Sequence, residues 1–83
     1  MDEKSENFNL SIYPNPVSNK LNIISPDIKN IKVDIIDLTG ALLYSKSLIQ
    51  QQTVIDVSDF NQGIYLIRYH VNGKFYYKKI VIE

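Results

Sequence analysis

Apolar and polar residues alternate with a period of two through most of the chain. The period is clearest where Ile31, Val33 and Ile35 alternate with Lys32 and Asp34. Successive side chains of a β-strand point to opposite faces, so this pattern predicts a strand with the three apolar residues inward and Lys32 and Asp34 outward. No window shows a helical apolar stripe of convincing length. The chain is therefore expected to be all-β.

Turn residues divide the chain into seven such runs. Pro14-Asn15-Pro16 ends the first run, because proline cannot donate a hydrogen bond to a sheet. Gly40 can supply the positive φ that a short hairpin needs, and Asn72-Gly73 predicts a tight type I′ hairpin. The expected strands cover residues 8–13, 20–24, 31–37, 41–48, 52–57, 64–71 and 74–82.

This spacing predicts seven antiparallel strands in two packed sheets over residues 8–83, preceded by a polar linker or tail at residues 1–7. In the fourth run, Leu42 and Tyr44 are expected to share a face, and Phe60 is expected to plug the end of the core. The sixth run is apolar on both faces, which suits a central strand. Its outer face then needs cover from a loop, from a long neighbouring side chain or from a partner.

Composition narrows the function classes. The 83 residues hold one domain, and nine basic residues balance nine acidic ones. Zero net charge argues against nucleic acid or an anionic membrane as the main partner. Without cysteine, neither a disulfide nor a cysteine-based zinc site can form. The apolar runs are too short for membrane insertion, and residues 1–7 are no signal peptide, so an export signal is expected elsewhere on a longer parent chain.

The chain offers few side chains for catalysis, and we expect it not to be an enzyme. His70 is the only histidine, and it is expected to face solvent near a hairpin end. Asp56 and Asp59 flank a turn, where such residues usually bond to backbone amides, whereas a calcium site needs several converging oxygens. Three separate glycines cannot form a phosphate cradle. No catalytic residue, metal site or cofactor is expected.

The aromatic residues leave a second function open. Tyr76 and Tyr77 are adjacent, so one of them can be exposed on a strand and stack on a sugar or a peptide, although tyrosine is also a good strand residue. Lys74, Lys78 and Lys79 make the last strand basic, and lysines on an edge strand discourage aggregation. A β-sandwich adhesion or carbohydrate-binding accessory module is therefore the alternative to the function considered next.

Several short motifs occur in a characteristic order. They are Tyr13-Pro14-Asn15-Pro16-Val17, Leu21-Asn22-Ile23, Asp37-Leu38-Thr39-Gly40, Ile55-Asp56-Val57-Ser58, Gly63-Ile64-Tyr65-Leu66-Ile67 and Lys78-Lys79-Ile80-Val81-Ile82. Over residues 8–83 this order resembles the type A C-terminal sorting domain of the type IX secretion system of Bacteroidota. The resemblance implies a seven-stranded immunoglobulin-like β-sandwich at the end of a larger cargo protein. Such a domain folds in the periplasm and accompanies its cargo to the cell surface or the medium.

The resemblance also implies partners. They are the outer-membrane secretion translocon, its shuttle protein, a sortase-like protease that cleaves upstream of Phe8, and an N-terminal cargo domain of the same parent chain. A last strand near a sheet edge can be extended by a partner through strand addition, which stays a hypothesis here. The residues that match the family motifs, and are candidates for recognition by the translocon, are Pro14, Asn15, Pro16, Gly40, Gly63, Tyr65, Lys78, Lys79, Ile80 and Ile82.

Overall fold

The computed structural model describes residues 10–25, 31–71 and 73–83, and their regular structure consists of strands. The seven strands are β1 (Ser11–Tyr13), β2 (Lys20–Ile24), β3 (Ile31–Ile36), β4 (Leu42–Leu48), β5 (Gln52–Asp56), β6 (Gly63–Val71) and β7 (Lys74–Ile82). Each corresponds to a predicted run, with small shifts at the ends. The predicted start of the first strand, at residues 8 and 9, lies outside the described residues.

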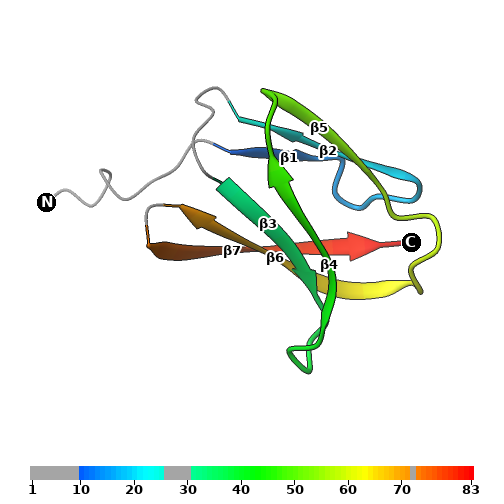
Figure 1. The fold of residues 1–83 in the computed structure, drawn as a ribbon. Helices are drawn as coiled ribbons and strands as arrows, with labels where there is room; N and C mark the ends of the chain where they lie inside the picture. Colours follow the sequence, from blue (N-terminus) through cyan, green and yellow to red (C-terminus); the bar gives the residue numbers. More distant parts are fainter. Residues whose placement is uncertain (1–9, 26–30, 72) are drawn as a thin grey trace, which may run out of the picture.

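The strands form two antiparallel sheets that face each other (Figure 1). One sheet has the order β1-β2-β5 and the other has the order β4-β3-β6-β7. Strands β1, β2 and β5 in one sheet and β3, β6 and β7 in the other match the constant-type immunoglobulin sandwich, whereas β4 pairs with β3 instead of joining the sheet of β5. The predicted fold class is confirmed.

The core lies between the two sheets and is built from alternate residues of the strands. This alternation follows from the period of two, since every second side chain of a strand points to the same face. Phe60 packs against the end of the core and meets the ring of Tyr65 edge-on at 5.7 Å, so the predicted plug is confirmed. The residues with no more than 1% exposure in this core are Val17, Leu21, Ile23, Val33, Ile35, Ile55, Val57, Ile67 and Ile80.

Two turns confirm the expected use of glycine. Gly40 has a φ of +92°, and Gly73 has a φ of +80°. Val71 pairs with Lys74, so two residues connect β6 to β7. The predicted hairpin type also depends on Asn72, which lies outside the described residues.

A β-bulge in β4 overturns the prediction that Leu42 and Tyr44 share a face. Ile35 pairs with Tyr44 whereas Ile36 pairs with Leu42, so one extra residue is inserted in β4. Paired residues lie on the same face, which places Tyr44 beside the core-facing Ile35 and places Leu42 on the outer face. Leu42 is accordingly 56% exposed, while Tyr44 packs against the core.

Asp34 is on the predicted outer face, yet it is buried there. It is 4% exposed, because β4 and β6 flank its strand and supply polar cover. Arg68 lies across from it on β6, with Nη2 and Nε at 3.0 Å and 3.1 Å from Oδ2, and the Ser45 hydroxyl donates to Oδ1 at 2.7 Å. The hydrogen bond to Asp34 raises the pKa of Arg68.

Long side chains cover part of the outer face of β6, which is one of the three kinds of cover that the sequence left open. The ring of Phe75 on β7 stacks on His70 at 4.4 Å, and the Arg68 guanidinium lies 5.3 Å from the centre of the same ring. His70 is therefore half-buried, which corrects the prediction that it faces solvent. At the other end of β6, Ile64 is 43% exposed on the same outer face.

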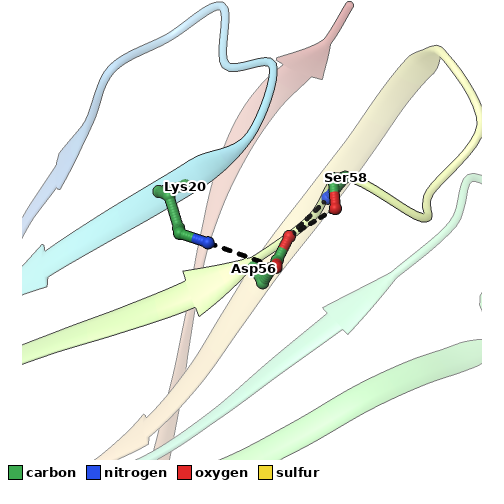
Figure 2. Close-up of polar contacts among 3 residues, drawn as sticks. All are labelled: Lys20, Asp56 and Ser58. Carbon is green, nitrogen blue, oxygen red and sulfur yellow. Dashed lines mark hydrogen bonds and ion pairs between the residues drawn. The ribbon is translucent and has the colours of Figure 1, made fainter.

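Aspartates bond to turn amides at two loops. Asp56 accepts hydrogen bonds from the Ser58 amide at 2.9 Å and hydroxyl at 2.6 Å, and from Lys20 Nζ at 3.2 Å (Figure 2). The Ser58 hydroxyl contributes most to lowering the pKa of Asp56 to about 2. Asp37 bonds similarly to the amides of Thr39 and Ala41, both at 2.9 Å. The prediction is confirmed for Asp56, whereas Asp59 has no such bond within the described part of the chain.

Candidate functional site

The last strand, β7, forms one edge of the four-stranded sheet, and β6 is its neighbour among the strands that the structure describes. An edge strand presents a row of main-chain N–H and C=O groups on its open side. In this protein, the segment that follows β1 lies along the second half of that open side. The candidate site consists of this segment and β7, which ends beside the carboxyl terminus in Figure 1.

The Asn15 side chain acts as a substitute for the main chain of a neighbouring strand. Its Nδ2 donates to the Lys79 carbonyl at 3.0 Å, and its Oδ1 accepts from the Val81 amide at 3.0 Å. A side-chain amide offers both a donor and an acceptor, as a peptide group does, so it can bridge two positions of an open strand edge. Asn15 thus joins the first loop of one sheet to the last strand of the other.

Val17 continues the join with its own main chain. Its amide donates to the Val81 carbonyl at 2.9 Å, and its carbonyl accepts from the Glu83 amide at 2.8 Å. These bonds form a parallel bridge between Val17 and Ile82. We call the contact of residues 15–17 with residues 79–83 the terminal join.

Pro14 and Pro16 flank Asn15 in this segment. Both are exposed, and the peptide bonds that precede them, Tyr13–Pro14 and Asn15–Pro16, are cis. Proline has no N–H, so neither position leaves a backbone donor open beside the strand. The sequence predicted that these prolines end the first strand and included them among the recognition candidates. The structure adds that Asn15 and Val17, between and after them, bond to the last strand.

The structure separates the motif residues of β7 into two kinds. Ile80 and Ile82 are 0% and 2% exposed, and they form part of the core. Lys78 and Lys79 are exposed and project to opposite faces of the strand, because they are adjacent. Neither lysine belongs to an ion pair found among the described residues. The end of the chain therefore presents two cations on a strand that the core holds in place.

Gly63 and Tyr65 lie next to the terminal join, since they pair with Ile82 and Ile80. Tyr65 is 8% exposed, and its hydroxyl donates to the Asn61 carbonyl at 2.6 Å. A tyrosine near the start of the sixth strand that bonds back to the preceding loop is the tyrosine corner of immunoglobulin-like domains. This geometry gives Tyr65 a role in folding the loop before β6.

Gly40 lies apart from this group. It is in the turn between β3 and β4, at the opposite edge of the four-stranded sheet. A Cβ at this position would meet nothing within 4 Å, so the positive φ is its only conformational requirement. The structure therefore brings nine of the ten predicted residues to β7 and its neighbours, and it places Gly40 elsewhere.

Sequence reasoning did not single out several residues on which the site depends. Val17, Val81 and Asn61 contribute main-chain atoms, which carry no signal in the residue type. Phe75 was not proposed as a site residue, and Tyr77 was considered only for stacking on a sugar or a peptide, although they are 53% and 56% exposed on the outer face of β7. The sequence could have indicated them, because Phe75, Tyr77 and Lys79 are spaced two residues apart, and residues two apart on a strand share a face.

The described ranges hold no group of three or more histidine, cysteine, aspartate or glutamate side chains that could bind a metal ion. Within the same ranges, no helix is long and apolar enough to cross a membrane.

The fold and the terminal join define a small immunoglobulin-like module in which the segment after β1 closes the second half of the last strand's edge. A model of the secretion system C-terminal sorting domain family matches residues 11–83, and the chain belongs to this family. It is a sorting domain of the type IX secretion system, a class of domain that directs export to the cell surface or the medium.

A solved structure with the same fold supports the architecture. It is that of PorZ, described as an essential bacterial surface component of the type IX secretion system of Porphyromonas gingivalis. The TM-score is 0.77 at 19% sequence identity, and the match covers 90% of this chain and 11% of the PorZ chain. A search of the curated proteins found no match. At this identity the likeness to PorZ shows the fold alone.

Proposed function

We propose that the folded domain is recognised by the outer-membrane translocon and its shuttle protein, which export a cargo domain attached to its N-terminal side. The parent chain passes through the periplasm and ends at the cell surface or in the medium. The family match over residues 11–83 carries this proposal. The domain itself performs no chemistry and acts only by binding.

The burial of the last strand supports recognition of the folded domain. Ile80 and Ile82 are in the core, and Asn15 holds the main chain of Lys79. Lys78 and Lys79 therefore have a defined position only when the sandwich has formed. A partner that reads both lysines together with the adjacent strand can distinguish a folded domain from an unfolded tail.

We further propose that a sortase-like protease removes the domain by cleaving upstream of Phe8. This step rests on the family resemblance and concerns residues 1–7, which lie outside the described residues. Mass spectrometry of the exported cargo would test it. Cargo that retains residues 10–83 after surface attachment would contradict removal.

An export assay tests the main proposal. Residues 1–83 are fused behind a Sec signal and a fluorescent protein, in a Bacteroidota host with and without a working type IX translocon. We expect fluorescence at the surface or in the medium only in the host with the translocon. Fluorescence that stays in the periplasm of both hosts, with the domain shown to be folded, would contradict it.

A pair of lysine variants tests the proposed contact. The double variant Lys78→Ser, Lys79→Ser should reduce export, because it removes both cations at the end of β7. The matched control is Lys32→Ser, Lys46→Ser, which removes two exposed lysines from β3 and β4 of the same sheet. Equal export from both double variants would show that the position of the lysines does not matter.

One observation favours the alternative, a carbohydrate-binding accessory module. Phe75 and Tyr77 are exposed on the same face of β7, and an aromatic pair of this kind can stack on sugar rings. Binding on a glycan array that is lost in Phe75→Ser and Tyr77→Ser would support this function. It would not by itself remove the export function, because the two use different partners.

A further inference from the structure

The first half of β7 has open main-chain groups that the terminal join does not reach. The join uses the carbonyl of Lys79, both main-chain groups of Val81 and the amide of Glu83. In a strand, the N–H and C=O of one residue point to the same side, and this side alternates along the chain. The main-chain N–H and C=O groups of the odd-numbered residues of β7 therefore point away from β6.

The same side carries the N–H and C=O groups of Phe75 and Tyr77 and the N–H of Lys79. No described residue bonds to these groups. Asn15 closes the edge from the Lys79 carbonyl onward, so the open stretch covers residues 74–78. At about 3.3 Å a residue, this stretch accommodates a partner strand of roughly five residues.

The side chains around the open stretch favour one kind of partner. The rings of Phe75 and Tyr77 are exposed on the outer face, and Lys78 and Lys79 flank them on the two faces of the strand. Opposite charges across paired strands are favourable, whereas like charges are unfavourable. A strand with acidic residues opposite the lysines and apolar residues opposite the rings would complement this surface.

A second copy of the chain is a poorer fit. Pairing of two β7 edges would place the same lysines of both copies close together, so their positive charges would repel each other. Lysines on an open edge oppose such self-pairing, and this protection is compatible with acceptance of an acidic strand. The charge of the edge thus selects the partner that it admits.

We propose that residues 74–78 of β7 form a docking edge, at which an extended acidic segment of an export-machinery protein adds as a further strand to the sheet. The partner in this inference rests on the proposed function. Main-chain hydrogen bonds would hold the added strand, and the lysines would favour an acidic sequence in it. The terminal join would set the end of the docking edge, since Asn15 already occupies the next position.

Proline substitution tests the docking edge without opening the sheet. The Tyr77 amide points to the open side, so Tyr77→Pro removes a docking donor but no bond to β6. Tyr77→Val is the matched control, because it removes the ring and keeps the amide. In the export assay we expect Tyr77→Pro to lower the exported fraction by about tenfold or more, and Tyr77→Val to stay within about twofold of the unmodified domain.

Thermal unfolding of the purified domains shows whether each variant folds. If Tyr77→Pro does not fold, Phe75→Pro and Phe75→Val provide the same comparison at another open amide. Normal export of a folded proline variant would overturn the docking edge. An equal loss in the valine control would also overturn it, because recognition would then depend on the ring.

Charge reversal tests the chemistry of the partner. The double variant Lys78→Glu, Lys79→Glu should export less than Lys78→Ser, Lys79→Ser, since it repels an acidic strand. Equal export from these two double variants would overturn the proposal that the partner strand is acidic. A dimer in sedimentation that Tyr77→Pro dissociates would instead identify a second copy as the occupant. If the unmodified domain is exported equally in hosts with and without a working translocon, the proposed function is overturned, and with it the partner inferred here.

Discussion

The side-chain amide of Asn15 bonds to the main-chain carbonyl of Lys79, which lies 64 residues later in the chain. Asn15 follows the first strand of one sheet, and Lys79 belongs to the last strand of the other. The second bond, from the Val81 amide to the same side chain, fixes the orientation of the Asn15 amide. This contact links the two sheets of the sandwich and closes half of an otherwise open sheet edge.

We predict that Asn15→Ala destabilises the domain by about 1–3 kcal/mol. The substitution removes two hydrogen bonds, each of which contributes about 0.5–1.5 kcal/mol when its partners can turn to water. Urea unfolding measures the change. The control is Asn19→Ala, an exposed asparagine whose side chain has no hydrogen bond among the described residues. An equal effect of the two substitutions would show that the terminal join does not stabilise the fold.

The ion pair between Arg68 and Asp34 predicts a larger effect. Arg68→Met leaves the buried Asp34 carboxylate without its cation, and loss of one partner of a buried pair costs about 3–5 kcal/mol. The control is Lys20→Met, which breaks an ion pair whose side chains are 60% and 56% exposed and should cost less than about 1 kcal/mol. Chemical denaturation of both variants measures the difference. Similar costs would mean that the Asp34 site is well hydrated.

Asp56 predicts a contribution to acid sensitivity. Its pKa is lowered from 3.8 to about 2 in the folded state, first by the Ser58 hydroxyl. The unfolded chain therefore binds this proton more readily, so the stabilising contribution is fully present above about pH 4 and is lost as the pH falls through about 2. Titration of the Asp56 carboxyl by NMR should show the low midpoint.

The variant Ser58→Ala should raise the Asp56 midpoint, because it removes the strongest hydrogen bond to the carboxylate. It should also reduce the dependence of the melting temperature on pH between about 2 and 4. Ser47→Ala serves as the control, since Ser47 is an exposed strand serine away from this loop. An unchanged midpoint in Ser58→Ala would contradict the assigned cause.

The tyrosine corner predicts that Tyr65→Phe destabilises the domain by about 1–2 kcal/mol. The change keeps the buried ring and removes the hydroxyl that donates to the Asn61 carbonyl. Tyr44→Phe is the matched control, because the half-buried Tyr44 packs on the core without a comparable bond in the described structure. Thermal unfolding of both variants provides the measurement. If export is lost in Tyr65→Phe while stability is unchanged, Tyr65 would instead act in recognition.

The alternation of residues was sufficient to predict the strands and the sandwich. A period of two requires only that one face of each strand be buried, which the residue types show directly. It could not predict the bulge near Leu42, because an inserted residue changes the face without changing the composition. Nor could it predict the burial of Asp34, since the arginine that compensates its charge lies 34 positions away on a neighbouring strand.

The candidate site divides in the same way. Motifs along the chain identified both the Pro14-Asn15-Pro16 segment and the end of β7, but they did not show that the two touch. Tertiary structure decided that contact, because it depends on main-chain atoms of Val81 and Glu83 and on the packing of two sheets. The sequence by itself determined the all-β sandwich, the turns and the family motifs through local preferences. Only the folded chain decided which half of the last edge is closed and which half stays open, because hydrogen bonding between distant strands sets it.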